Sequence, residues 1–272
     1  MASIIQMSDP HFGTEQPAVV EALVRLVAEE KPDLVILSGD ITQRAQVHEF
    51  TAARRFVDRL GLPTFVIPGN HDIPLFNGAL RAFAPYRRYQ AAFPGPLEPR
   101  HASNDVLVIG LATTRRYRHK DGQVSRRQIE STSALLRQAR PGQLRIVVMH
   151  HPVHVTRPAD ITNLLHGRAA AIRAWADAGA DIIMGGHIHL PYVRSLAQDF
   201  DALPRQLWAV QAGTALSSRI RHEAPNSVNL LRHDRGSPGQ ARVERWDFLA
   251  GMQRFQPVTI DELLLGPVER TA

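Results

Sequence analysis

Aspartate, asparagine and histidine side chains follow five separate apolar segments, each at the point where the segment ends. They are Asp9 and His11, Asp40, Asn70 with His71 and Asp72, His150 with His151, and His187 with His189. Imidazole, carboxylate and amide ligands suit manganese, iron, zinc or magnesium-like ions, and a chain without cysteine offers no thiolate. One such motif alone is more often a turn cap or a packed histidine than a metal site. Five of them in order predict one shared site.

The motifs also fit a pair of metal ions. Asp-x-His and His-x-His place two side chains on one side of an extended chain, whereas adjacent residues point apart. A carboxylate can bridge two cations, and two ions about 3.5 to 4 Å apart can stabilise the attacking and leaving oxygens of an in-line displacement. The residues therefore indicate metal-assisted displacement chemistry.

The apolar segments that carry these residues alternate with amphipathic ones, which is typical of a layered α/β protein. Strands are expected at 4–7, 34–37, 65–67, 106–111, 144–149 and 181–184, and helices at 18–30, 47–60, 126–139 and 168–178. Further strands at 207–211, 228–231 and 241–248 are expected to close the fold in antiparallel pairs. In layered α/β folds, ligands gather at the carboxyl ends of strands, where these candidate residues lie.

One domain is expected over residues 1–250, followed by a C-terminal tail at 251–272. An insertion at about 73–105 interrupts the strand and helix pattern with prolines, aromatic residues and arginines, so we expect it to be irregular and partly helical. The tail carries one apolar cluster, Leu263 to Leu265, which is expected to dock on the core.

The 272 residues carry a formal net charge of +6 and no cysteine. This composition excludes a disulfide scaffold and suits an anionic partner, without selecting among a phosphate ester, a nucleic acid and a membrane surface. The N-terminus lacks the features of a secretory signal, and no apolar run reaches the roughly 18 residues of a transmembrane helix. We therefore expect a cytoplasmic protein without a transmembrane segment.

Taken together, the motifs closely resemble the signature of the calcineurin-like metallophosphoesterases, and most strongly their class III cyclic nucleotide phosphodiesterase branch. The matching residues are Asp9-Pro10-His11, Gly39-Asp40, Gly69-Asn70-His71-Asp72, His150 and Gly186-His187-Ile188-His189. The resemblance runs from about residue 3 to about residue 190. It implies an α/β fold of four layers, an α-β-β-α metallophosphoesterase sandwich with two mixed β-sheets flanked by helices.

The resemblance also implies a ligand set. One metal ion is expected on Asp9, His11 and His189, the other on Asn70, His150 and His187, with Asp40 bridging both. Manganese or iron are the expected ions, in divalent or trivalent form, and zinc is the alternative. His150 is assigned in preference to His151 because the family pattern is histidine, any residue, proline, and Pro152 sets the register.

The same resemblance implies a nucleophilic hydroxide shared by the two ions, with His71 stabilising charge or protonating the leaving alkoxide. Asp72 is expected either to orient His71 or to hold its loop. Arg44, His151 and Arg115 are the candidate substrate-binding residues, and the alternative for His151 is a position behind the metal ligands, where it would support them.

Several other residues carry two interpretations. The segment with Arg219 and Arg221 is either a loop that reaches the substrate phosphate or an exposed hairpin. Phe12, Phe76 and Tyr86 either stack on the substrate or pack in the core, and His154 and His166 are weaker candidates for the pocket wall.

The function expected is hydrolysis of small phosphodiesters such as 3′,5′-cyclic AMP. The alternatives are a lipid-linked pyrophosphate hydrolase, with the insertion at 76–93 as an apolar and basic lid, and a broad-specificity phosphomonoesterase. A nuclease and a scaffold with a decayed site rank lower, because the chain has no lysine-rich tail and every ligand position carries its expected type. The expected partner is a small, nucleotide-like phosphoester, with no stable nucleic acid partner, and the chain is expected to form a homodimer.

Overall fold

The computed structural model describes residues 1–75, 77–118, 120–221 and 224–267. Its first sheet has six strands in the order β12-β11-β10-β1-β2-β3. Their bounds are β1 (Ala2–Met7), β2 (Leu34–Ser38), β3 (Thr64–Ile67), β10 (Ser227–His233), β11 (Gln240–Leu249) and β12 (Arg254–Leu264). The strands β1, β2 and β3 run parallel, and β10, β11 and β12 join them in antiparallel pairs. This sheet is therefore mixed.

The second sheet is also mixed and has the order β4-β5-β6-β7-β9-β8. Its strands are β4 (Arg100–Ala102), β5 (Val106–Leu111), β6 (Leu144–Met149), β7 (Ile182–Gly185), β8 (Tyr192–Ser195) and β9 (Trp208–Gln211). The four central strands are parallel, while β4 and β8 pair antiparallel at the two edges. The parallel strands are apolar because both of their faces are covered.

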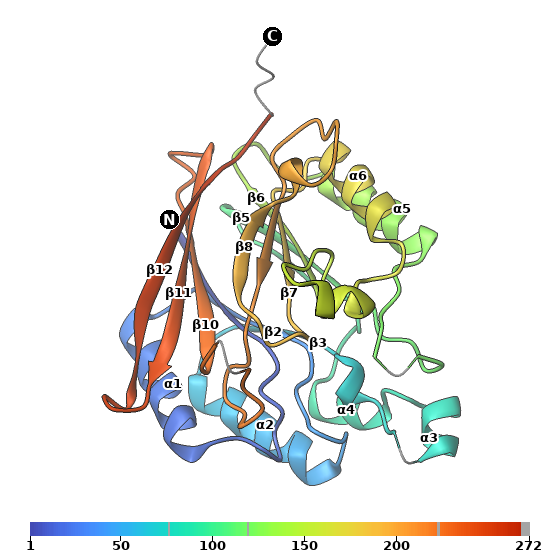
Figure 1. Ribbon diagram of the computed structural model, residues 1–272, viewed down its shortest axis with the longest axis vertical. Coiled ribbons are helices and arrows are strands. Elements are labelled where there is room, and N and C mark those ends of the chain that lie inside the picture. Colours follow the sequence, from blue (N-terminus) through green and yellow to red (C-terminus); the bar gives the residue numbers. More distant parts are fainter. Residues whose placement is uncertain (76, 119, 222–223, 268–272) are drawn as a thin grey trace.

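Helices cover the outer face of each sheet (Figure 1). The helices α1 (Pro17–Glu30) and α2 (Val47–Leu60) pack on the first sheet, and α5 (Arg126–Leu136) and α6 (Arg168–Asp177) pack on the second. In β1, Ile4 faces the other sheet whereas Ile5 faces the helices; in β6, Val148 and Val147 divide in the same way. This alternation follows from the two-residue period of a strand. The four-layer α-β-β-α sandwich predicted from the sequence is confirmed.

Local sequence explains where the helices begin and end. Pro17 occupies the first turn of α1, where its missing N–H costs nothing, and Gly61 ends α2 in a left-handed conformation. Ser125 caps α5, and Gln128, three residues further on, completes a capping box with it. The helix ends at Leu136, three residues before its predicted end.

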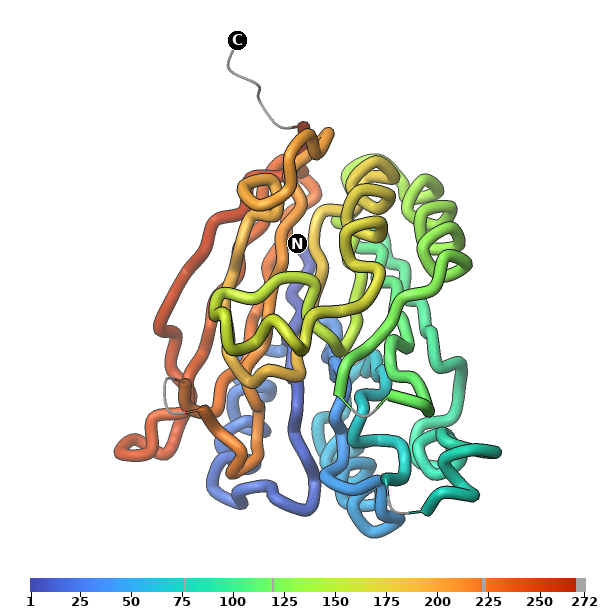
Figure 2. Tube along the Cα trace, turned by 45° about the vertical axis from the view of Figure 1, so that its right-hand side comes forward, coloured from blue at the N-terminus to red at the C-terminus, as the bar shows by residue number. Residues whose placement is uncertain are grey.

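The insertion after β3 is irregular and partly helical, as predicted. It contains α3 (Gly78–Phe83) and α4 (Arg87–Ala92), and it is preceded by a 3₁₀ turn, η1 (Asn70–Asp72). Figure 2 shows this segment on the side of the molecule opposite β11 and β12. Tyr89 and Phe93 are buried in the same cluster as Phe50 of α2. Two further 3₁₀ turns, η2 (Pro158–Asn163) and η3 (Leu196–Gln198), complete the regular elements.

The residues predicted to form a C-terminal tail instead include an edge strand. The strand β12 pairs with β11 along its length, so a boundary at residue 250 would divide a sheet. Phe255 is buried beneath α1, and Leu263 lies between the two sheets. Pro257 lies within this strand and is tolerated there because β12 is at the edge of the sheet.

Among the residues that the structure describes, no helix has the length and apolar character needed to cross a membrane.

The burial of Phe255 yields a test of the edge strand. We expect Phe255→Ala to lower the free energy of unfolding by about 3 to 5 kcal/mol, because it removes a ring that is 2% exposed and leaves a cavity. Val258→Ala, at a side chain that is 45% exposed on the same strand, is the matched control and should change it by less than about 1 kcal/mol. Urea unfolding measures both. Equal stabilities of the two variants would mean that residues 254–264 do not belong to the core.

Candidate dinuclear metal centre

Five strand ends bring the candidate ligands to one edge of the sandwich. Asp9 and His11 follow β1, Asp40 follows β2, Asn70 begins the turn after β3, His150 follows β6, and His187 and His189 follow β7. Three of these strands belong to the first sheet and two to the second. The side chains form two groups, Asp9 with His11 and His189, and Asp40 with His150 and His187. Within each group the ligand atoms lie within 4.8 Å of one another.

The first group is compact and buried. The Nε2 atoms of His11 and His189 lie 3.1 Å apart. Oδ1 of Asp9 lies 3.2 Å from Nε2 of His189 and 3.8 Å from Nε2 of His11. Three potential ligand atoms therefore face one point.

The second group lies beside the first and shares Asp40 with it. Oδ1 of Asp40 is 3.3 Å from Nε2 of His150, while Oδ2 is 3.8 Å from Nε2 of His11 in the first group. Nε2 of His150 also lies 3.2 Å from Oδ1 of Asn70 and 3.3 Å from Nδ1 of His187. The two oxygens of Asp40 thus face different groups, which is the arrangement expected of a bridging carboxylate.

The hydrogen bonds around the ligands fit metal ions at both groups. Oδ2 of Asp9 accepts from the hydroxyl of Ser8 at 2.5 Å and from the N–H of His187 at 2.9 Å, whereas Oδ1 is buried without a hydrogen bond. Nδ1 of His150 donates to the carbonyl oxygen of Ser38, and Nδ1 of His189 donates to that of Arg219. These bonds place the ring proton of His150 and of His189 on Nδ1, so the Nε2 atom of each ring keeps a lone pair that can bind an ion.

The pKa values of the buried ligands reflect charge that a cation would balance. Burial opposes ionisation of Asp9 and Asp40, yet the neighbouring histidines hold the pKa of each carboxyl below its usual range. Burial alone would lower the pKa of His150, but Asp40 raises it to about 9. Burial lowers the pKa of His11 and of His187 to about 3, so both are neutral imidazoles suited to binding metal.

The backbone is strained where it presents these ligands. Asp9, His11, Asp40, His187 and His189 all have positive φ, between 44° and 74°. Such conformations are rare outside glycine and cluster at functional sites, where the surrounding structure enforces them. A Cβ at Gly69 would overlap the backbone nitrogen and Oδ1 of Asp40, and one at Gly186 would overlap Ser8. Glycine is needed at both positions because the ligand loops approach so closely.

His71 and Asp72 have distinct roles in the loop after β3. The N–H of His71 donates to Oδ1 of Asp40 at 2.8 Å, and its Nδ1 donates to the carbonyl oxygen of Gln43 at 2.8 Å. Asp72 is buried and accepts from the N–H groups of Gly69, Ile41 and Thr42 and from the Thr42 hydroxyl. Of the two roles expected for Asp72, holding the loop agrees with these contacts.

Two of the three candidate substrate-binding residues, His151 and Arg115, do not line the cavity that Asn70 and His71 line, so the prediction that they bind substrate is corrected. For His151, the alternative position behind the metal ligands agrees with the structure. His151 is fully buried, with Nδ1 bonded to the hydroxyl of Thr113 and Nε2 to the carbonyl oxygen of Lys120. Its ring packs against His150 and His187, which makes it a support for them.

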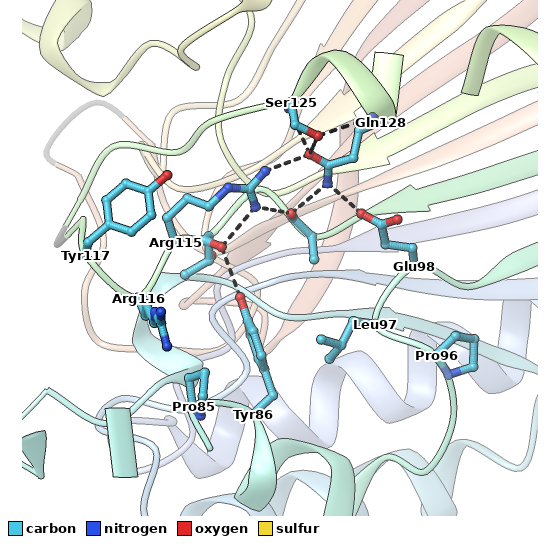
Figure 3. A pocket seen from close by; sticks show the side chains of 12 residues that line it. Pro85, Tyr86, Pro96, Leu97, Glu98, Arg115, Arg116, Tyr117, Ser125 and Gln128 are labelled. Carbon is cyan, nitrogen blue, oxygen red and sulfur yellow. Dashed lines mark hydrogen bonds between the residues drawn. The ribbon is translucent and has the colours of Figure 1, made fainter. Parts of the chain in front are cut away.

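Arg115 lines a different cavity of about 680 Å³, which none of the candidate ligands lines (Figure 3). Its guanidinium donates to the carbonyl oxygens of Ala112 and Thr114 and to Oε1 of Gln128. These neutral acceptors hold it in the wall of that cavity. Tyr86 lines the same cavity, and its hydroxyl donates to the carbonyl oxygen of Thr114.

Arg44, the third candidate, lines a cavity of about 340 Å³ together with Asn70 and His71. Arg219 lines it too, and its Nη1 lies 3.1 Å from Oε1 of Gln43, 3.4 Å from Nε2 of His71 and 3.5 Å from Nε2 of His11. Of the two alternatives for the segment with Arg219 and Arg221, the structure favours the loop that reaches the site.

Gln43, Lys120 and Arg81 also line the cavity and were missed in the sequence. Gln43 carried a signal as a polar residue in the loop of Asp40, and Arg81 carried one as an arginine of the insertion.

Of the remaining candidates that the structure describes, none belongs to a ligand group or lines the cavity of Arg44. His154 pairs with Asp199, and His166 pairs with Asp121 near the surface. Phe12 is buried against Phe56, which agrees with the core interpretation. Phe76 lies outside the described residues.

Removing the amide of Asn70 tests the second group. We expect Asn70→Ala to reduce the metal content of manganese-loaded protein from about two ions per chain toward one, and to lower kcat by roughly 100-fold or more. Asn104→Ala, at an exposed position, is the control and should keep both values. Metal analysis and kinetics measure the two effects. Full metal content and turnover in Asn70→Ala would remove Asn70 from the ligand set.

The raised pKa of His150 yields a pH dependence. In metal-free protein His150 should hold a proton up to about pH 9, and this proton must leave before Nε2 binds an ion. Affinity for Mn²⁺ at this group should therefore fall as the pH is lowered from 9, by up to about tenfold per unit. Histidine ¹⁵N NMR of the metal-free protein measures the titration directly, with His150→Asn to assign the signal. A histidine spectrum without a titration above pH 8 would contradict it.

Comparison with known proteins agrees with this geometry. Over 80 residues the chain is 34% identical to the probable glycerophosphodiester phosphodiesterase GpdQ of Arcobacter nitrofigilis, a match that covers 25% of this chain and 29% of that protein. Over 81 residues it is 31% identical to a probable cyclic nucleotide phosphodiesterase of Synechococcus sp., covering 26% of this chain and 32% of that protein. The matches thus span a third or less of each curated relative.

Solved structures share the fold at low sequence identity. A purple acid phosphatase from yellow lupin (Lupinus luteus) superimposes with a TM-score of 0.73 at 14% identity, over 97% of this chain and 53% of that chain. A dimetal phosphatase from Danio rerio gives 0.68 at 11% identity, over 97% of this chain and 99% of that chain. Residues 2–191 match the family described as calcineurin-like phosphoesterase. The chain therefore belongs to the calcineurin-like phosphoesterases, a family of metal-dependent phosphoester hydrolases that bind two metal ions.

Proposed function

We propose that this protein is a dinuclear phosphodiesterase that hydrolyses small phosphodiesters, cyclic nucleotides such as 3′,5′-cyclic AMP among them. The observation that carries the proposal is the position of Asp40, whose two oxygens face separate ligand groups while the N–H of His71 donates to one of them. Two partial matches to proteins named as diesterases, one for glycerophosphodiesters and one for cyclic nucleotides, support a diester substrate.

The roles of the residues follow from their contacts. Asp9, His11 and His189 would hold one ion, Asn70, His150 and His187 would hold the other, and Asp40 would contribute an oxygen to each. When bound, two such ions activate a water nucleophile and polarise the phosphoryl oxygens; manganese or iron are the proposed ions, and zinc is the alternative.

His71 is the proposed proton donor to the leaving oxygen. Its Nδ1 donates to the carbonyl oxygen of Gln43, so its Nε2 points toward Arg219 and the cavity that both residues line. A protonated Nε2 can pass its proton to an alkoxide there, while Arg219 is placed to hydrogen-bond a phosphoryl oxygen.

The lipid-linked pyrophosphate alternative depends on the insertion as an apolar lid. Tyr89 and Phe93 are buried against α2, and Tyr86 donates to the backbone of Thr114, so these rings are not available to a lipid. Among the aromatic residues of the insertion that the structure describes, Phe83 is the exception, at 89% exposed. A broad-specificity phosphomonoesterase is the second alternative. A homodimer, a cytoplasmic location and the absence of a stable nucleic acid partner stay predictions.

The substrate class can be tested with two chromogenic esters. We expect manganese-loaded protein to hydrolyse bis(p-nitrophenyl) phosphate with a kcat/KM at least about tenfold above that for p-nitrophenyl phosphate, and to lose both activities after chelation. Cyclic nucleotides would then be assayed next. A preference for the monoester would favour the phosphomonoesterase, and activity that survives chelation would exclude the metal mechanism.

His71→Ala separates chemistry from metal binding. We expect kcat for the diester to fall by about 10² to 10⁴ while the metal content is unchanged, because the ring contacts backbone and pocket but is not in either ligand group. His48→Ala, at an exposed position on α2, is the matched control and should keep both values. Loss of metal from His71→Ala at unchanged kcat per bound ion would show that its role is structural.

A further inference from the structure

The cavity beside His71 is lined by more positive charge than the scissile group requires. Arg44, Arg81, Lys120 and Arg219 all line it, and no aspartate or glutamate is among its lining residues in the described chain. Its volume is about 340 Å³, and Asn70 and His71 form the wall that it shares with the metal centre. Ile73 and Leu75 add apolar surface.

Two of these cations contact neutral groups. Arg81 donates to the carbonyl oxygens of Pro74, Arg116 and Arg118. Arg219 contacts the amide oxygen of Gln43 and the imidazoles of His11 and His71. These contacts hold both guanidinium groups at the cavity wall without cancelling their charge, so several like charges face the same small volume. An anion in the cavity would be attracted by these charges.

The reaction itself does not supply enough negative charge. Asp9 and Asp40, a hydroxide nucleophile and one diester monoanion together offset the charge of two divalent ions. The charges of Arg81 and Arg219, which contact neutral groups, can therefore attract a further negative group of the substrate. Guanidinium groups suit a phosphate, since their donors pair with two of its oxygens at once.

We propose that this cavity binds a second phosphate group of the substrate, adjacent to the scissile diester, an inference that rests on the proposed phosphodiesterase function. Arg44 and Lys120 are its specificity-determining residues, because both side chains are exposed at the cavity and neither belongs to a ligand group. A diester that carries a further phosphate, such as a phosphorylated nucleotide ester, fits this site better than a diester whose remaining groups are neutral.

The test compares two ligands that differ by one phosphate. Calorimetry measures the Kd of thymidine 3′,5′-bisphosphate and of thymidine 5′-monophosphate with manganese-loaded protein. We expect the bisphosphate to bind at least tenfold more tightly. A ratio near two is the statistical effect of having two phosphates for one metal site, and it would overturn the proposal.

Variants distinguish the cavity from general surface charge. Lys120→Ala and Arg44→Ala should each reduce the ratio of the two Kd values by at least threefold. Arg126→Ala removes an exposed arginine at the start of α5, paired with Glu130, and should leave the ratio unchanged. A similar loss in all three variants would mean that the bisphosphate responds only to net charge, which contradicts the site.

Hydrolysis of bis(p-nitrophenyl) phosphate, measured on the same samples, separates the two proposals. Diester hydrolysis with a ratio near two would overturn the second-phosphate site and leave the phosphodiesterase function intact. A ratio above ten without diester hydrolysis would contradict the proposed function while retaining the phosphate site, because the binding measurement does not depend on turnover.

Discussion

The placement of Asp40 is the constraint on which the rest of the site depends. Its carboxylate is buried with that of Asp9, and each oxygen faces a different group of histidines. Two buried negative charges are costly unless cations or hydrogen-bond donors surround them. The raised pKa of His150 and the N–H that His71 directs at Asp40 are consequences of this charge. Burial is the main cause of the raised pKa of Asp72, and the charge of Asp40 adds to it.

The four-layer packing makes this charge arrangement attainable. Asp9, Asp40 and Asn70 come from the first sheet, and His150 and His187 come from the second. The apolar cluster between the sheets, with Ile4, Ile36, Ile146 and Val148, sets the distance between their carboxyl ends. The centre therefore exists only when the two halves of the chain are packed together. Mutations that change the volume of that core would shift the positions of the metal ligands.

Strain in the ligand loops is the structural cost of this geometry. Five ligand residues adopt positive φ, a conformation that costs about 1 to 3 kcal/mol each outside glycine. The loops are held by buried hydrogen bonds in return. Asp72 joins the loop after β3 to the loop after β2, and Thr214 donates to the carbonyl oxygen of Asp9. The carbonyl oxygen of Arg219 orients His189, and the side chain of Arg219 reaches His71. One loop therefore contributes to both the metal centre and the cavity.

The sequence by itself determined the strands other than β4, β8 and β12, the four longer helices and the set of candidate ligands, because periodicity and motif spacing are local properties. It also determined that the ligands lie at strand ends. Only the tertiary structure decided which side chains face the site. His151 is adjacent to His150 yet turns into the core, Arg115 lies in another cavity, and Arg219 arrives from a loop 30 residues beyond His189. The strand β12 was missed for a related reason, since its pairing partner and not its own pattern makes it a strand. The direction in which a side chain points, and its distance from segments far apart in the sequence, depend on how the two sheets pack. No local sequence pattern predicts either of them.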